Sequence, residues 1–278
     1  MHILEFSLLL FAVSYAAGLV GALTGLGGGV VLVPALVLLF GVDIHYAMGA
    51  SLISVIATSS GAAAAFVREG FTNLRIAMFL EMAAVVGAVA GALLATHLNA
   101  SVIAVIFGGV LAFSSYFSLR RREGAEAHPA SHPWALRLGL EGSYHSATGP
   151  RHYSVQHVPA GAALMGLAGA LSGLLGIGAG AVKVLAMDQA MRLPYKVSTA
   201  TSNFVIGITA AASAGVYFTR GYVDPGLTMP VMLGVLLGAL SGARIMVGAK
   251  SRRLRLVFSI VILVLAAEMI YQGLTGGR

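Results

Sequence analysis

The sequence predicts an all-α membrane protein, a polytopic helix bundle of two inverted repeats with glycine-broken or re-entrant helices. Of its 278 residues, 58% are hydrophobic and only 10% are charged, and the mean hydropathy is +0.90. Soluble domains carry about a quarter charged residues, so this chain cannot cover a water-facing surface. Uncharged runs such as Leu98 to Leu119 can cross a bilayer at roughly 1.5 Å per residue. Because the runs are continuously apolar rather than alternating, they favour helices over a barrel.

Hydrophobic runs between charged or turn-forming residues define ten segments. The predicted segments are 6–25, 28–42, 46–67, 75–96 and 100–119, then 158–175, 179–191, 196–219, 226–247 and 255–272. The first is interpreted as a retained span, since Met1 to Ser7 lacks the basic region of a signal peptide. The second and seventh are too short to span untilted, which favours re-entrant or half-length helices.

Three parts of the chain follow from these segments: a first transmembrane repeat at 1–119, a linker at 120–157 and a second repeat at 158–278. The linker is rich in His, Pro, Ser and Gly, which indicates a solvated, partly ordered cytoplasmic loop. Its histidines lack a close ligand spacing, and the chain has no cysteine, so neither a metal nor a cofactor is predicted. The linker histidines are His128, His132, His145, His152 and His157.

The two repeats share glycine landmarks in the same order. The stretch Gly18 to Gly25 aligns with Gly166 to Gly173, and Gly87 and Gly91 correspond to Gly238 and Gly242. Val31 to Leu36 likewise matches Val182 to Met187. Agreement at several landmarks indicates an internal duplication.

Charge sets the orientation of the repeats. The net charge of +7 is concentrated in short connections, a pattern of cytoplasmic loops rather than of a nucleic-acid surface. With Arg120 to Arg122 inside, alternation puts the Asp43 to His45 connection outside but its counterpart, with Arg192 and Lys196, inside. Lys250 to Arg255 also fall inside. The repeats are therefore predicted to be inverted, with both termini outside, which is a transporter architecture whose substrate site lies near the midplane.

The glycine-rich stretches 24–29 and 173–180 lie inside apolar runs and are predicted to be unwound. Unwound backbone survives at membrane depth only inside protein or beside a wet cavity, and its free N–H groups can bind an anion. The alternative is that the glycines only allow close helix packing. The substrate-binding candidates here are Thr24, Gly27, Gly28, Gly29, Gly176 and Gly178.

Lys183 follows the second glycine stretch, between Val182 and Val184. A lysine within a membrane segment is a functional candidate, here as a fixed cation for an anionic substrate. Alternatively, it reaches an interface or pairs with Asp188. We expect Lys183→Ala to abolish transport while leaving folding intact.

Further polar side chains occupy the membrane segments. Hydroxyl and amide groups at the start of the eighth segment can cap the helix or donate to an oxyanion. The substrate candidates among them are Thr201, Ser202 and Asn203, with Ser51 at the equivalent place in the first repeat. Glu81 and Asp188 are candidates for proton coupling or for buried pairs, and Gln189 and Arg244 are further candidates. Motifs of catalysis such as His-Glu-x-x-His or Gly-x-Ser-x-Gly are absent, so an enzyme is not predicted.

The stretch Gly18 to Pro34, followed by Ala47 to Leu52, resembles the first signature of the TauE/SafE sulfite-exporter family. Gly173 to Lys183 and Ala200 to Asn203 resemble its second signature. The resemblance implies export of a small sulfur-containing anion, such as sulfite or sulfoacetate, across the bacterial cytoplasmic membrane with proton coupling. A passive anion channel and an importer of a different small anion are the alternatives. The expected partners are the anion and the lipid bilayer, not nucleic acid, and a homodimer is left open.

The second signature departs from the family pattern. Ala179 and Ala181 interrupt its glycine run, Leu185 replaces the usual proline, and Lys183 is added. The substrate of this chain therefore does not follow from the family alone.

Overall fold

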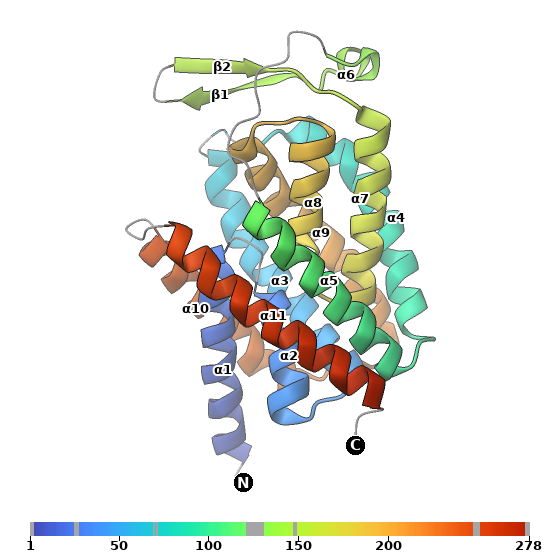
Figure 1. Ribbon diagram of the computed structural model, residues 1–278, viewed down its shortest axis with the longest axis vertical. Coiled ribbons are helices and arrows are strands. Elements are labelled where there is room, and N and C mark those ends of the chain that lie inside the picture. Colours follow the sequence, from blue (N-terminus) through green and yellow to red (C-terminus); the bar gives the residue numbers. More distant parts are fainter. Residues whose placement is uncertain are drawn as a thin grey trace.

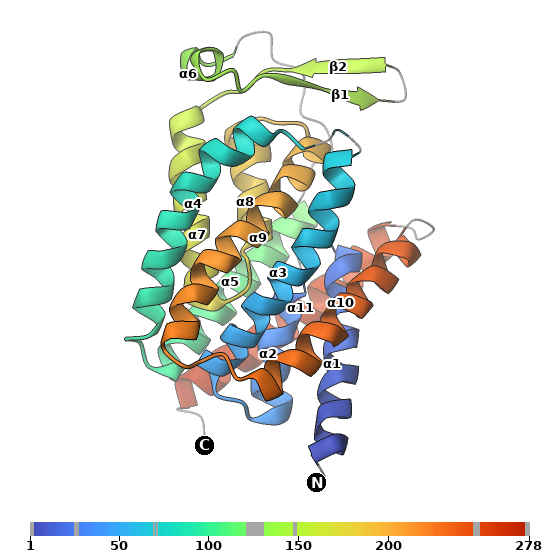
Figure 2. The same cartoon turned by 180° about the vertical axis from the view of Figure 1, so that it is seen from behind.

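The fold is an all-α bundle, which confirms the predicted class (Figures 1 and 2). The computed structural model describes residues 3–24, 28–68, 70, 72–120, 131–146, 149–246 and 251–275. The first half contains α1 (Ile3–Thr24), α2 (Gly29–Phe40), α3 (Ile44–Arg68), α4 (Leu74–Ala95) and α5 (Ala100–Arg120). The second contains α7 (Val158–Leu175), α8 (Gly180–Leu185) with the π-helical turn η1 (Ala186–Ala190), α9 (Tyr195–Thr219), α10 (Pro225–Met246) and α11 (Ser251–Thr275).

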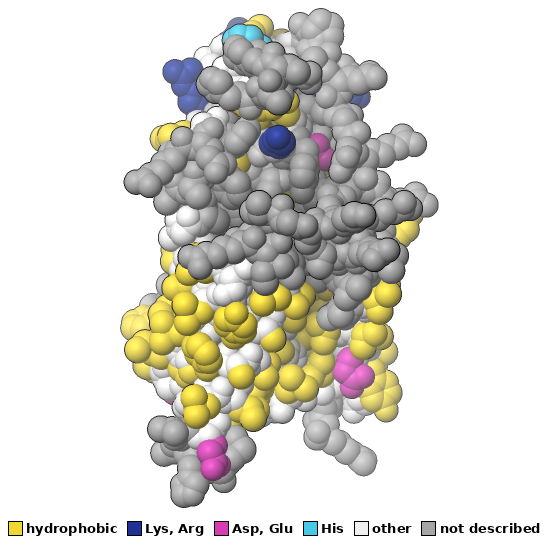
Figure 3. Space-filling view, turned by 90° about the vertical axis from the view of Figure 1, so that its left-hand side faces the viewer, with side chains coloured by type: hydrophobic (Ala, Val, Ile, Leu, Met, Phe, Trp, Pro, Cys, Tyr) yellow, Lys and Arg dark blue, Asp and Glu magenta, His cyan; other side chains and the backbone are white. Residues whose placement is uncertain are grey.

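Four of the described helices are long and apolar enough to cross a membrane: Leu74–Ala95, Val158–Leu175, Lys196–Thr219 and Pro225–Gly242. Shorter apolar helices accompany them. Figure 3 shows a hydrophobic belt around one side of the molecule, with the visible lysine and arginine side chains beyond it, toward the linker end. The chain is therefore a multi-pass membrane protein.

Two elements are about half a membrane long. The helix α2 has 12 residues, and α8 with η1 has 6 and 5 residues. At about 1.5 Å per residue, neither crosses a hydrocarbon core of about 30 Å. Gly41, at a φ of 62°, ends α2 and lets the chain turn directly into α3. The two segments that seemed too short to span are thus half-length helices.

Every major helix pair joins the two halves of the chain. α1 packs on α10, α4 on α7, α3 on α9 and α5 on α11. Exchanging the first and second halves maps this set of pairs onto itself. Both termini lie at one end of the bundle and the linker at the other, and α1 and α7 run in opposite directions (Figures 1 and 2). The duplication itself stays a prediction.

Glycines set the approach of the paired helices. On α4 and α7, an added Cβ would lie 2.0 Å from a carbonyl oxygen of the facing helix at Gly87, Gly91, Gly169 and Gly173. Gly238 makes the same approach from α10 to Tyr15 of α1. At these positions, close packing is the reason for glycine.

The described part of the linker contains secondary structure. It forms α6 (Pro133–Arg137) and an antiparallel hairpin of β1 (Gly142–Ser146) and β2 (Gly149–Tyr153) at one end of the bundle (Figure 1). Asn73, which caps α4, donates from its side chain to the Leu140 carbonyl and to the Tyr153 hydroxyl oxygen. The linker histidine His128 lies outside the described residues. These contacts fasten the hairpin to the membrane bundle.

Candidate functional site

The second glycine stretch is an unwound connection between α7 and α8. Gly176 and Gly178 have φ angles of 68° and 73°, and Ala179 has a φ of 46°. Left-handed backbone is open to glycine but costs an alanine about 1 to 2 kcal/mol. The last carbonyls of α7 lack helical partners, and the buried Tyr217 hydroxyl donates to one of them, on Gly173, at 3.0 Å. The break is therefore held by a specific side chain from α9.

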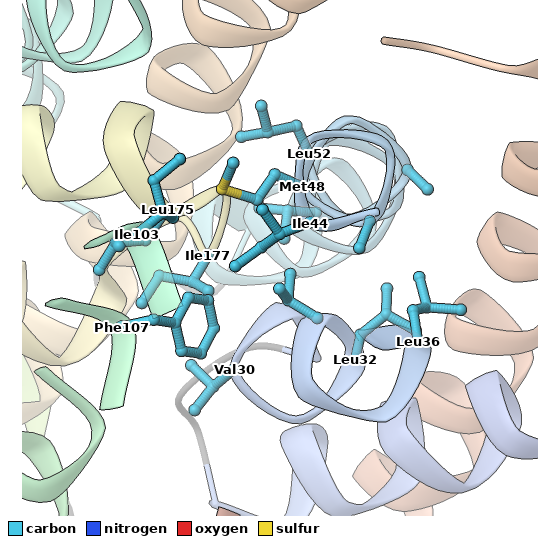
Figure 4. Packing of buried hydrophobic residues seen from close by; sticks show 14 of the residues in the cluster. Val30, Leu32, Leu36, Ile44, Met48, Leu52, Ile103, Phe107, Leu175 and Ile177 are labelled. Carbon is cyan, nitrogen blue, oxygen red and sulfur yellow. The ribbon is translucent and has the colours of Figure 1, made fainter. Parts of the chain in front are cut away.

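The two glycine stretches meet inside the bundle. An added Cβ on Gly29, the first residue of α2, would lie 3.2 Å from Cα of Ile177 in the second stretch. Val55 of α3 lies against both Gly29 and Gly178. Figure 4 shows Ile177 and Val30 in the same packed cluster. Backbone from both halves thus converges at one buried point.

A serine from a long helix meets the start of each half-length helix. Ser51 of α3 lies beside Gly29, with its Oγ 2.7 Å from the position of an added Cβ. Ser202 of α9 donates to the Gly180 carbonyl at 3.4 Å. Both serines are buried, and the described residues offer the Ser51 hydroxyl no hydrogen-bond partner. Ser51 is thus a free buried donor at the meeting point.

Lys183 extends from α8 into the bundle and is 0% exposed. Its Nζ donates to the Thr209 hydroxyl at 2.6 Å. Thr209 in turn lies 2.9 Å from Oε1 of Glu81 on α4, which is 7% exposed. Three helices therefore bring together a lysine, a hydroxyl and a carboxyl group. Sequence alone named Lys183 and Glu81 as separate candidates.

This network is one turn of α9 away from the glycine break, because Ile206 contacts Gly178 and Thr209 lies three residues later. Burying an ion without a partner in a low-dielectric interior costs several kcal/mol of stability. The opposite charges of Lys183 and Glu81 therefore stabilise each other. Within the described residues, Glu81 Oε2 is buried without a hydrogen-bond partner. One of the two carboxylate oxygens is thus left without a hydrogen bond in the network.

The remaining candidates are only partly brought together. Thr201 accepts from the Asn73 backbone N–H at 3.2 Å, at the linker end of α9. The Asn203 amide donates to the Thr199 carbonyl of its own helix, so it serves α9 locally. In η1, Asp188 is half-buried and Gln189 is exposed. The positions whose side chains are not described are Thr24 and Arg244, and Gly27 lies outside the described residues.

Sequence reasoning missed Thr209. A signal exists in the spacing of buried hydroxyls along α9, where Ser202, Thr209 and Ser213 follow at intervals of seven and four residues. These intervals keep all three on one helix face. A buried polar stripe at helical spacing would have identified Thr209.

Glu81 also borders a groove of about 910 Å³ beside α4 and α9. Its walls are mainly apolar and include Met78, Met82, Phe204 and Ile208. A second, polar pocket of about 300 Å³ lies between the start of α4 and the hairpin. Tyr153 lines it, and burial raises the pKa of Tyr153 while the hydrogen bond from Asn73 lowers it.

Comparisons with known proteins identify a family and several relatives of the chain. The family model described as "Sulfite exporter TauE/SafE" matches residues 10–269. The chain is 28% identical to "Probable membrane transporter protein YunE" of Bacillus subtilis (strain 168), over 96% of this chain and 98% of that protein. "Probable membrane transporter protein YdhB" of the same strain is 28% identical, over 85% and 89% of the two chains. "Probable membrane transporter protein ORF9" of Sinorhizobium sp is 26% identical, over 97% and 93%. Solved structures gave no match.

Proposed function

Because the chain belongs to the sulfite exporter TauE/SafE family, a family of membrane transporters, we propose that it exports a small sulfur-containing anion. The substrate is sulfite, sulfoacetate or a similar organosulfonate, and it crosses the bacterial cytoplasmic membrane. The basic linker side faces the cytoplasm and the two termini face outward. Transport is secondary, coupled to protons, and proceeds by alternating access.

The observation that carries this proposal is the buried Lys183 beside the converging glycine stretches. A fixed cation in a low-dielectric interior attracts an anion far more strongly than one in water. Hydroxyl and backbone N–H groups then complete the shell of an oxyanion, because each supplies a directed donor. Ser51 has such a hydroxyl, and the same chemistry suits a sulfite or sulfonate group with several acceptor oxygens.

Alternating access fits the half-length helices. Lys183, Ser51 and Ser202 are each at most 1% exposed, so neither end of the bundle reaches them in this conformation. Movement of the packed helix pairs against one another would open the site to one side at a time. Glu81 is the first candidate for proton coupling, because it shares the Thr209 hydroxyl with Lys183. Asp188 is the second.

Flux and binding test the proposal together. The purified protein is screened for thermal stabilisation by sulfite, sulfate, thiosulfate, sulfoacetate and non-sulfur carboxylates, because a ligand of the native state raises stability. The best ligand is then followed in proteoliposomes with an imposed pH gradient. We expect selective stabilisation by a sulfur anion and uphill flux driven by the gradient. Stabilisation by carboxylates alone would refute the substrate class, and flux that only dissipates a gradient would indicate a channel.

A further inference from the structure

We infer that the Thr209 hydroxyl couples the two charged groups, so that each anion bound at Lys183 is accompanied by one proton bound at Glu81. This inference rests on the proposed function and adds its charge balance. It also makes Thr209 a positioning residue, which acts through Lys183 and Glu81.

The geometry of Thr209 gives it two alternative hydrogen bonds. Its hydroxyl oxygen accepts from Lys183 Nζ at 2.6 Å. Its single hydrogen faces two acceptors at nearly equal distance, Oε1 of Glu81 at 2.9 Å and the Val205 carbonyl at 2.8 Å. A hydroxyl has one hydrogen and two acceptor sites, so it donates to one of these oxygens at a time.

The protonation of Glu81 decides between them. When Glu81 is ionised, the stronger bond is to the carboxylate, and Thr209 links the ammonium to its countercharge. When Glu81 takes a proton, its O–H donates to Thr209, and Thr209 donates to the Val205 carbonyl instead. Lys183 then keeps its hydrogen bond to Thr209 but no longer faces the negative charge of Glu81. The bound anion replaces that negative charge.

Charge balance makes the two events dependent on each other. Without substrate, Lys183 and ionised Glu81 sum to zero. With a monovalent anion and a proton on Glu81, the sum is again zero. Binding either one alone leaves a net charge in a buried site, which costs several kcal/mol. The proton is taken from solvent and carried on the carboxyl group, with no other bond made or broken.

Other charges near the network are few. α7 carries no Asp, Glu, Lys, Arg or His, and α9 carries only Lys196 in its first turn. Arg75 lies on α4 together with Glu81, and Asp188 lies on η1 after Lys183. α3 also packs on α9 and carries His45 near its start and Arg68 at its end. The shared Thr209 hydroxyl joins only Lys183 and Glu81 among these groups of the described helices.

Infrared difference spectroscopy follows the proton directly. Isethionate is added to the purified protein in detergent, because this monovalent sulfonate has no carboxyl group and takes up no proton itself. We expect the band of a protonated carboxylic acid to appear on binding while a carboxylate band is lost. Glu81→Gln must remove this pair of bands. Calorimetry in two buffers of different ionisation enthalpy counts the protons taken up, and about one per anion is expected from linkage.

Variants of Thr209 separate its role from simple packing. Thr209→Val keeps the shape but removes the hydroxyl, so Lys183 and Glu81 rest as neutral groups and the anion-induced carboxyl band disappears. Thr209→Ser restores the hydroxyl and the band. The matched control is Ser213→Ala, which removes a buried hydroxyl one turn later that donates to the Thr209 carbonyl of its own helix. Its spectrum must match the wild type.

The outcomes distinguish the two proposals. Binding of a probe without a carboxyl band, or a band that persists in Glu81→Gln or Thr209→Val, overturns the coupling and leaves the transport of sulfur anions standing. If calorimetry detects no binding of isethionate, sulfite or sulfoacetate, the proposed function fails, and the coupling inference fails with it.

Discussion

Removing one member of the pair of Lys183 and Glu81 should cost far more stability than removing both. Lys183→Met leaves a carboxylate that is 7% exposed without its countercharge, and Glu81→Gln leaves a lysine that is 0% exposed in the same position. Breaking a buried pair typically costs about 3 to 5 kcal/mol, whereas replacing both partners is often nearly neutral. We therefore expect each single variant to lose about 3 kcal/mol or more, and the double variant to lose much less than their sum.

The assay is equilibrium unfolding of the purified variants in mixed micelles, read as a double-mutant cycle. Additive effects of the two single variants would mean that Lys183 and Glu81 do not interact, and would refute the electrostatic reasoning. The sequence led us to expect that Lys183→Ala leaves folding intact. Because Lys183 is buried beside Glu81, we now expect this variant to lower stability as well as transport.

Three further predictions concern backbone and linker. Gly173→Ala puts a Cβ 2.0 Å from the Ala88 carbonyl oxygen and should cost about 1 to 3 kcal/mol or more in micelle unfolding, whereas Gly215→Ala, with nothing within 4 Å, should be stabilising or neutral. Ala179→Gly should raise stability by about 1 kcal/mol in the same assay, since it relieves a φ of 46°, and a loss would contradict the strain. Burial raises the pKa of Tyr153, so the folded hairpin favours the neutral phenol, and its stability should fall above about pH 10. Absorbance titration checks this, and Tyr153→Phe should reduce the alkaline loss of stability.

Much of the fold could be predicted because runs of hydrophobic residues in the sequence identify membrane helices. The predicted segment 75–96 became Leu74–Ala95, and 158–175 became Val158–Leu175. The hairpin in the linker was not predicted, since its strands have five residues each and its docking depends on Asn73, far away in the sequence. Local patterns carry little information about such contacts.

The candidate site was predicted in parts but not as a network. Lys183 and Glu81 each stood out as charges in apolar segments, whereas Thr209 lies 128 residues from Glu81 and is an ordinary threonine in sequence. The glycines illustrate the same limit. Gly178 is required because its backbone is left-handed, whereas Gly173 is required because α4 lies close to it. The two glycines look alike in the sequence, and only the folded structure shows which reason applies to each. Unwound backbone and close helix packing therefore both occur, at different glycines.

The pairing of helices across the two halves has a consequence for biosynthesis. α1 is made well before its partner α10, so the face of α1 around Tyr15 and Gly18 stays exposed to lipid until α10 is inserted. α4, by contrast, meets α7 soon after the linker is complete. Assembly should thus begin at the middle of the chain and close at its ends. Two separately expressed fragments, split within the linker, should find each other in the membrane, because the contacts that join them are the same ones that hold the intact protein together.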